Sequence, residues 1–311
     1  MDYWQKWGYG NDYYRLLGQA ETEFTLHAPE TLGALYTPYC ARIQPAKLVR
    51  NLARLVEKRG ATIYENTAAT TIDQVTTTST SAHVTARWTV NAIEAWQSQH
   101  DARSRIPVYS LMIATEPLSP AVLDSIGLAK HETFADLRNL IIYGQRTADD
   151  RIAFGGRGAP YHWGSALHPR FDRHQRIHSL IHEVLIELLP QLENSAITHQ
   201  WGGPLGIHRD WRPAISIDQD SRVISAGGYV GDGVAATHLA GRTIAHAIAQ
   251  VPSHLLELPW VNHPTQRWEP EPLRWLGANL GLRAMTLADS EERLTRRPSV
   301  AAGIFRRFLG H

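Results

Sequence analysis

The most regular pattern of apolar and polar positions lies in residues 43–66. Its apolar positions recur at helical spacing on one face, at Leu48, Leu52, Leu55 and Val56. Pro45 suits the first helical turn, and Gly60 suits the position after the last turn. We therefore predict a helix here, followed directly by a short strand over ATIYEN, residues 61–66.

Alternating and β-rich stretches predict strands along most of the remaining chain. The predicted strands are HVTARWTV (83–90), PVYSLMIAT (107–115), LIIYGQRT (140–147), RIAFGGR (151–157), ITHQWGG (197–203), PAISID (213–218) and RVISAGG (222–228). Asp149 and Asp150 form a turn signal between two of them, which indicates a hairpin. RIHSLIHEVLIELL, residues 176–189, has helical spacing instead. The pattern predicts a mixed α/β fold with much antiparallel sheet, and an irregular tail from Pro252.

Composition narrows the classes of partner. A chain of 311 residues has room for about two domains. The formal net charge of +1 offers no long-range attraction for nucleic acid or anionic lipid. No apolar run approaches the roughly 20 residues that a membrane span needs, and the single cysteine is typical of a reducing compartment. We expect a cytoplasmic protein with neither nucleic acid nor membrane as partner.

One glycine-dense turn stands out, in AGGYVGDGVAATHLAGRTIAHAI, residues 226–248. Gly227, Gly228, Gly231 and Gly233 lie where a predicted strand turns into a predicted helix. Backbone N–H groups and the positive end of the helix dipole at such a turn can bind an anionic or electron-rich group. A tight turn without any ligand is the alternative that these glycines leave open.

Several stretches together resemble the FAD-dependent oxidoreductases of the D-amino-acid-oxidase-like superfamily, which includes glycine and sarcosine oxidases. They include GALYTPYCARIQPAKLVRNLARLVEKRGATIYENT, IYGQRTADDRIAFGGRGAPYHWG, THQWGGPLGIHRDWRPAIS and AGGYVGDGVAATHLAGRTIA. The resemblance implies FAD as cofactor, a small amine or amino acid as substrate, and oxidation by hydride transfer to the flavin. It also implies that the cofactor residues Gly227, Gly228, Gly231, Gly233 and Val234 lie beside the flavin ring, where a helix N-terminus would stabilise developing negative charge.

The pattern changes from helix-strand alternation to hairpins near Pro107 and back near Trp201, and this change, with the resemblance, indicates a domain plan. We expect residues 41–104 and 201–250 to form a partial, discontinuous FAD-binding domain and residues 105–200 to form an antiparallel substrate domain. Residues 1–40 would join the substrate domain, and residues 251–311 would form a C-terminal tail.

One departure from the family is large. A flavoprotein of this class needs a strand, a G-x-G-x-x-G turn and a helix to hold the FAD pyrophosphate, and this sequence contains no such motif. We expect a truncated chain that holds FAD poorly, with exposed apolar faces on the 48–56 helix and the 84–90 strand. Two functions stay open: an amine-oxidising flavoenzyme fragment, and a non-catalytic remnant or subunit that needs a partner chain to supply the dinucleotide half.

The remaining candidate residues carry weaker signals. Arg157, Tyr161 and His162 follow a predicted strand, where the guanidinium could pair with a substrate carboxylate. The interpretation that we favour for them is a surface hairpin end with an aromatic cluster. Trp201 is a candidate beside the flavin, together with the segment HRD at residues 208–210.

For the other polar residues, a purely structural role is the alternative to a catalytic or metal-binding one. Asp210 could form a salt bridge with Arg209 or Arg212 instead of taking part in catalysis. We expect solvated histidines and no metal site, because the His178 and His182 pair lacks the intervening Glu of a zinc-protease helix. We interpret Cys40 as a packed small residue.

Overall fold

The computed structural model describes residues 2–73, 76–79, 82–300 and 302–303. The chain divides into two compact units. Unit 1 comprises Met1–Gln44, Ser110–Gly158 and Asp172–Gly202, and unit 2 comprises Pro45–Tyr109, Ala159–Phe171 and Gly203–His311. Contacts alone do not show what either unit binds, so the assignment of a cofactor domain and a substrate domain stays a prediction.

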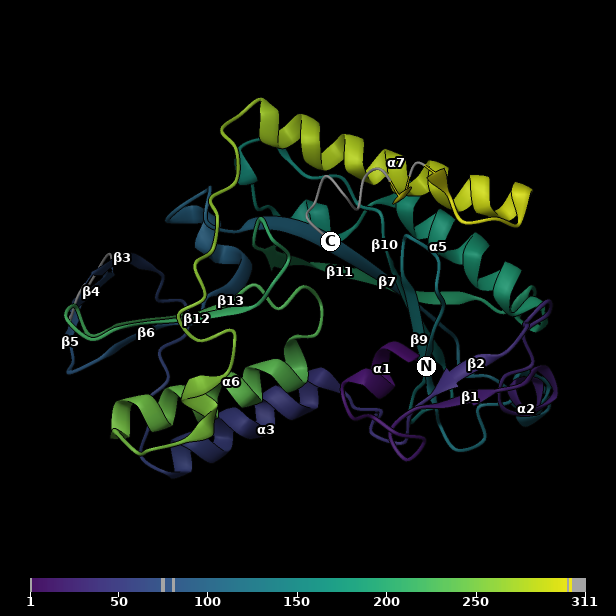
Figure 1. The fold of residues 1–311 in the computed structure, drawn as a ribbon, viewed down its shortest axis with the longest axis horizontal. Helices are drawn as coiled ribbons and strands as arrows, with labels where there is room; N and C mark the ends of the chain where they lie inside the picture. The colour runs from purple at the N-terminus through teal and green to yellow at the C-terminus, as the bar shows by residue number, and fades with distance from the viewer. Residues whose placement is uncertain (1, 74–75, 80–81, 301, 304–311) are drawn as a thin grey trace. The chain divides into compact units, whose positions relative to one another are not determined.

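Unit 1 is built on an antiparallel sheet. The main sheet has the strand order β11-β7-β10-β9-β8, and α5 packs on β10 (Figure 1). Its elements are α1 (Asp2–Lys6), β1 (Arg15–Leu17), α2 (Gln19–Thr25), β2 (Ala34–Tyr36), α4 (Pro120–Ile126), β8 (Thr133–Ala135), β9 (Ile142–Arg146), β10 (Ile152–Arg157) and α5 (Gln175–Leu188). Two long strands, β7 (Ile106–Thr115) and β11 (Ile197–Ile207), contribute to both units.

Close packing fixes the central hairpin of unit 1. The β9–β10 pair is antiparallel, with Phe154 opposite Gly144, and the side chains of Ile152 and Phe154 are fully buried. A Cβ on Gly144 would lie 2.3 Å from the ring of Phe134. Glycine is therefore required there so that the aromatic ring can lie flat on the neighbouring strand.

Unit 2 contains two small sheets and most of the long helices. In the first sheet, β13 pairs antiparallel with β12 and parallel with β6. The second has the order β3-β4-β5. The elements are α3 (Pro45–Lys58), β3 (Ala69–Asp73), β4 (Thr76–Ser79), β5 (His83–Thr85), β6 (Thr89–Asn91), β12 (Ala214–Asp218), β13 (Val223–Gly227), α6 (Gly233–Ala249) and α7 (Leu273–Thr295).

The core of unit 2 lies between the first sheet and α6. Ile215 and Ile224 of the sheet are fully buried against Ala240, Ile244 and Ala247 of the helix. Short 3₁₀ helices cover residues 94–99, 163–165, 169–172, 190–192 and 254–257 of the chain. No helix among the described residues is long and apolar enough to cross a bilayer.

The mixed α/β fold is confirmed, but three predicted elements are wrong. Residues 61–66 form no strand, because they find no partner strand among the described residues. Residues 83–90 split into β5 and β6, which belong to different sheets. The tail beyond Pro252 contains the 23-residue helix α7 rather than irregular chain. Residues 301 and 304–311, at the end of the predicted tail, lie outside the described residues.

The predicted apolar exposure in unit 2 is confirmed. No residue of α3 is buried, and the stripe of Leu48, Leu52 and Leu55 is about half exposed. Val84 and Val90 are exposed as well. In its described sheet β6 is an edge strand, with β13 on one side only. Unit 2 therefore presents an amphipathic helix whose apolar face is about half exposed.

Candidate functional site

The glycine-dense turn joins β13 to α6 within unit 2. Its backbone turns through positive φ values at Gly228 (76°), Val230 (55°) and Gly231 (100°). Residues with a Cβ rarely adopt such angles, so the turn favours glycine. Gly227 and Gly228 are buried, whereas Gly231 and Val234 are exposed. The five predicted cofactor residues thus divide into the buried pair Gly227 and Gly228 and a more exposed group near the helix start. In that group Gly233 is partly buried.

Close contacts explain the buried pair of glycines. A Cβ on Gly227 would lie 1.6 Å from Nη1 of Arg105, and a Cβ on Gly228 would lie 2.3 Å from Nδ1 of His208. Neither side chain could stay in place beside a larger residue. These two glycines therefore serve the packing of the loop on Arg105 and His208.

A carboxylate braces the buried end of the loop. Oε2 of Glu94 accepts hydrogen bonds from the N–H of Gly228 (2.8 Å) and from Nη1 of Arg105 (3.2 Å), while Oε1 accepts from the N–H of Tyr229 (3.3 Å). The Arg105 side chain is only 3% exposed, and it also donates to the carbonyl of Ala226 (3.1 Å). Burial lowers the pKa of Arg105, and the facing charge of Glu94 opposes that shift. The pair supplies both charge balance and hydrogen bonds inside unit 2.

The exposed end of the loop is the start of α6. No side chain caps this N-terminus among the described residues, and the first turn contains no acidic residue. The N–H groups of Gly233, Val234 and Ala235 have no acceptor within the helix, as in the first turn of any α-helix. With the positive end of the helix dipole, they suit an electron-rich edge of a planar ligand.

Replacing Gly228 with alanine should destabilise unit 2. The new methyl group would meet the His208 ring at a φ of 76°, so we expect a loss of about 1–3 kcal/mol in the free energy of unfolding. Gly241 of α6 is the matched control, because a Cβ there meets nothing within 4 Å and alanine should stabilise the helix by about 0.5–1 kcal/mol. Chemical denaturation of the two variants measures both effects. Equal stabilities would show that His208 does not restrict the loop.

His208 lies behind the loop as a neutral imidazole. Its Nδ1 is 2.8 Å from the carbonyl of Arg212, which assigns the ring proton to that nitrogen. Burial lowers the pKa of His208 below its usual value. Together with Arg105 and His263, this ring lines a cavity of about 340 Å³ in unit 2.

The expected ion pair of Asp210 with an arginine is wrong. Arg209 pairs with Glu269 at 3.0 Å and lies over the Trp268 ring, while Asp210 accepts from Nε2 of His263 at 2.6 Å. Arg212 reaches Asp210 only through its backbone N–H, at 3.3 Å. These contacts connect the chain after β11 to the segment before α7.

The structure places the three predicted catalytic residues in different units. Arg157 ends β10 in unit 1, opposite Ser110 of β7, and its side chain lies outside the described residues. Trp201 belongs to β11 in unit 1; its ring is 40% exposed, and its carbonyl lies 3.3 Å from Nε2 of His178. Tyr161 belongs to unit 2. Their catalytic roles stay predictions.

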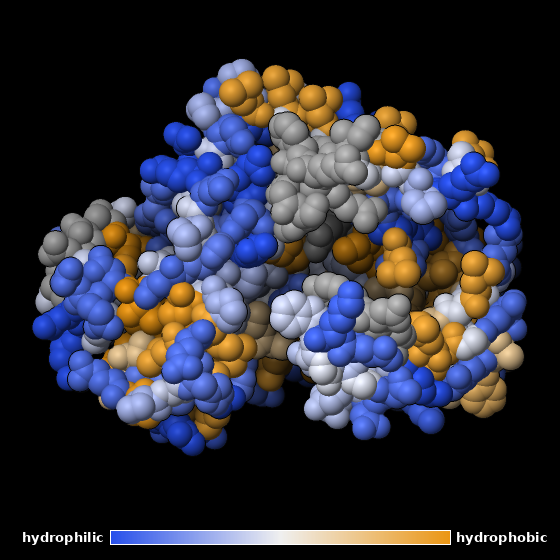
Figure 2. Space-filling model, viewed as in Figure 1, coloured by the Kyte–Doolittle hydropathy of each residue, from blue (hydrophilic) through white to orange (hydrophobic). Residues whose placement is uncertain are grey.

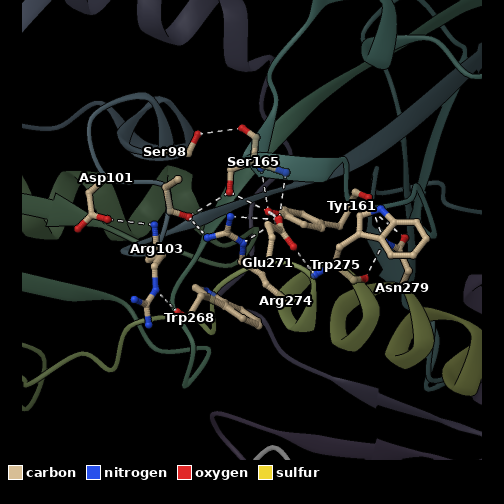
Figure 3. A network of polar contacts seen from close by, with 12 residues as sticks. Ser98, Asp101, Arg103, Tyr161, Ser165, Trp268, Glu271, Arg274, Trp275 and Asn279 are labelled. Carbon is tan, nitrogen blue, oxygen red and sulfur yellow. Dashed lines mark hydrogen bonds and ion pairs between the residues drawn. The ribbon is translucent and has the colours of Figure 1, made fainter.

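Tyr161 is buried in a polar network at the start of α7 (Figure 3). Its hydroxyl donates to Oε1 of Glu271 (3.0 Å) and accepts from the N–H of Ser165 (2.8 Å). Glu271 also accepts from Arg274, which is 4% exposed, and from the N–H of Trp275 (2.9 Å). Burial raises the pKa of Tyr161. Through Glu271 these contacts join Tyr161 to the first turn of α7. The neighbouring candidate, His162, stacks on the Phe171 ring with 3.4 Å between centroids.

Stability at acidic pH should report on Glu271. Burial would raise the pKa of Glu271, but hydrogen bonds from Gly164, Trp275, Tyr161 and Arg274 hold it below the usual 4.5. Because the native state favours the charged form, its contribution is complete above pH 4.5 and is lost as pH falls further. Glu271→Gln should cost about 1.5–3 kcal/mol at pH 7. Urea unfolding between pH 3 and pH 7 should show the gap to the parent closing in acid; a gap independent of pH would contradict this account.

Two expectations about other side chains are wrong. His178 is 1% exposed rather than solvated, because its ring lies on the buried side of α5. Cys40 is exposed rather than packed, with Sγ 3.3 Å from Oγ1 of Thr133. No group of three or more potential ligands could hold a metal ion among the described residues.

Sequence reasoning missed Glu94 and Arg105. They lie in and after NAIEAW, where no spacing connects them to a loop more than 120 residues further along the chain. The available signal was a carboxylate, Glu94, shortly after one predicted strand and a basic residue, Arg105, shortly before the next. Such a pair is too common in sequences to indicate a buried ion pair.

Comparisons with known proteins match most of the chain. Residues 1–247 match the family model described as FAD dependent oxidoreductase (DAO). The chain is 28% identical over 252 residues to γ-glutamylputrescine oxidoreductase of Escherichia coli, an alignment that covers 79% of the chain and 56% of that protein. It is 30% identical over 196 residues to the probable oxidoreductase OrdL of Haemophilus influenzae, covering 62% of the chain and 40% of the relative. The chain thus spans about half the length of the curated relatives it matches.

Solved structures show the same fold at low identity. Glycine oxidase from Geobacillus kaustophilus has a TM-score of 0.70 at 19% identity, with 84% of this chain and 68% of that chain covered. L-proline dehydrogenase from P. horikoshii has a TM-score of 0.67 at 19% identity, with 78% and 66% covered. At this identity the likeness describes the fold alone.

Proposed function

The chain belongs to the family of FAD-dependent oxidoreductases (DAO), and from this membership we propose that it forms the flavin-ring end and the substrate part of an enzyme that oxidises a small amine or amino acid. The relatives' names refer to γ-glutamylputrescine, glycine and L-proline. Each of these compounds contains a primary or secondary amine nitrogen, and this shared feature defines the substrate class proposed here.

The observation that carries the proposal is the uncapped start of α6 behind an exposed glycine turn. Gly231, Gly233 and Val234 would contact the flavin ring, and the N–H groups of the first turn would face its electron-rich edge. When bound, FAD supplies the two-electron acceptor for the amine. Glu94 and Arg105 keep the loop in position from behind, since Gly228 already donates its N–H to Glu94.

The fit covers only one end of the cofactor. The sequence contains no G-x-G-x-x-G turn, and such a turn with its helix is what holds the FAD pyrophosphate in dinucleotide-binding folds. The chain by itself is therefore proposed to hold FAD weakly. A non-catalytic remnant or subunit is the second candidate, and the same observation favours it.

We place the missing dinucleotide-binding half against α3 and β6. The half-exposed stripe of Leu48, Leu52 and Leu55 and the open edge of β6 are the two features that a strand and helix would cover. That half could come from a partner chain or from another part of a longer polypeptide. A cytoplasmic location stays a prediction from composition.

Arg157 remains the best candidate for a substrate carboxylate. A guanidinium paired with a carboxylate contributes about 1.5–3 kcal/mol. In a complex with a dinucleotide-binding part that holds FAD, Arg157→Ala should therefore lower kcat/KM about 10- to 100-fold for carboxylated amines. Amines without a carboxylate should be unaffected. Equal losses for both classes would assign Arg157 a structural role. Tyr161 and Trp201 stay proposed as residues that line the substrate site.

Flavin bleaching tests the proposed function. The chain would be co-expressed with the dinucleotide-binding part of a curated relative, purified as a complex and mixed with amines without oxygen. We expect small primary or secondary amines to bleach the flavin absorption band of the complex. Bleaching of the FAD-bound complex by dithionite but by no amine in a broad panel would overturn amine oxidation. The non-catalytic remnant or subunit would then be the function that remains.

A further inference from the structure

The outer face of α7 carries leucines at seven-residue intervals. Leu273, Leu280, Leu287 and Leu294 follow this spacing, and each is between 60% and 85% exposed. Arg274, Gly281 and Ala288, each one position after a leucine of this series and so about 100° further round the helix, are buried. Figure 2 shows the result as a line of hydrophobic residues along the exposed side of α7.

The apolar stripe on α7 is narrow. Seven residues fall about 20° short of two full helical turns, so the four leucines and Leu276 lie within a sector of about 60°. A helix that packs on a core or lies in a bilayer surface presents a wider apolar face, of about 100° or more. Polar residues border the stripe, with Arg283 and Ser290 exposed beside it. A stripe of this width fits the side of one helix laid along it. Leucine recurs at one position of each heptad only, because the second apolar position of a coiled-coil heptad is Leu276 and then Arg283 and Ser290.

We propose that the α7 leucine seam, defined as Leu273, Leu276, Leu280, Leu287 and Leu294, pairs antiparallel with the same seam of a second copy of this chain. Four equally spaced leucines present the same pattern in both directions. A second copy turned end to end therefore places Leu280 opposite its Leu287 and Leu273 opposite its Leu294. The antiparallel arrangement also brings opposite ends of the two helix dipoles together.

The apolar area is sufficient for a weak dimer. The five leucines expose between 42% and 85% of their surface; this amounts to about 500 Å² per copy, so a symmetric pair buries roughly 1,000 Å², the lower range of specific interfaces. Gly277 and Ala284 lie beside the seam and leave space for the leucines of the other helix. We expect dissociation in the micromolar range, at concentrations accessible to sedimentation.

Sedimentation tests the seam. The whole chain in a Cys40→Ser background should show a concentration-dependent dimer. Leu280→Arg should shift its dissociation constant at least tenfold towards monomer. Leu137→Arg is the matched control, because Leu137 is a fully exposed leucine of unit 1 and its replacement should leave the dimer unchanged. Leu52→Glu on α3 should also leave it unchanged, which separates the seam from the other apolar face.

Disulfide trapping tests the direction of pairing. Leu280→Cys and Leu287→Cys proteins in the same background should cross-link several-fold more when mixed than either alone. In the antiparallel pair, identical positions are about 10 Å apart along the axis, further than a disulfide spans. A monomer at all concentrations, or cross-links only between identical positions, would overturn the proposal. So would a Leu280→Arg protein that keeps its oligomeric state but loses binding to anionic lipid vesicles.

Discussion

Replacing Arg105 with methionine is expected to lower the free energy of unfolding by about 3–5 kcal/mol, the cost of leaving one member of a buried ion pair without its partner. The Arg105 side chain is almost inaccessible, and it connects Glu94 to the carbonyl of Ala226 on β13. Its loss would leave a carboxylate facing the N–H groups of the glycine loop without the balancing charge. Urea unfolding of the parent and the variant at neutral pH measures the effect.

Arg209→Met is the matched control for this prediction. Arg209 pairs with Glu269, whose side chain is 43% exposed, and an ion pair in contact with solvent contributes only about 0–1 kcal/mol. A loss at Arg105 no larger than the loss at Arg209 would show that the Glu94–Arg105 brace contributes little. The double variant Glu94→Gln, Arg105→Met should recover part of the stability, because it removes both charges together.

The second large effect is expected on α3. Replacing Leu48, Leu52 and Leu55 together with glutamate should raise the soluble, monodisperse fraction several-fold, because these side chains form a half-exposed apolar stripe with no buried residue on its helix. Stability should change little, since substitutions at exposed positions usually stay within about 0.5 kcal/mol each. Dynamic light scattering and thermal unfolding measure the two quantities.

A buried leucine supplies the control for the α3 prediction. Leu111→Glu replaces a fully buried leucine of unit 1 and should unfold the chain. If the triple variant of α3 were destabilised as severely as this control, the α3 stripe would have to be covered in the isolated chain. If the triple variant stayed folded but lost association with a dinucleotide-binding partner, the placement of that partner on α3 would be supported.

Elements defined by local pattern could be predicted from the sequence. The helix α3 and the β9–β10 hairpin follow from apolar spacing and from the turn at Asp149 and Asp150. The strand predicted over residues 61–66 failed because a strand exists only with a neighbour, and no spacing in the sequence supplies one. Helix α7 was missed because its buried side consists of Arg274, Gly281 and Ala288, while its leucines face outward. The usual inference from apolar spacing to a buried face is reversed there.

The candidate site was predictable only in part. The glycine turn could be predicted because its backbone conformation restricts which residues fit locally, at Gly228 and Gly231. The reason for glycine at position 227 is the approach of Arg105, a contact between residues more than 120 positions apart. The link from Glu94 to the N–H of Gly228 spans 134 positions. Such contacts depend on the folded arrangement of β6, β7 and β13 and leave no periodic trace in the sequence.

The FAD content of the isolated chain tests the central claim most directly. The claim is that the chain contains the part of the site that contacts the flavin ring and lacks the part that holds the pyrophosphate, which normally contributes most of the anchoring. The 311-residue chain should be purified in the presence of added FAD, passed through a desalting column and measured for its flavin absorption band and its mass. The account predicts a colourless protein with far less than one FAD per chain. A protein that retains close to one FAD per chain, as monomer or dimer of this chain alone, would contradict it, because another segment would then have to supply the pyrophosphate site.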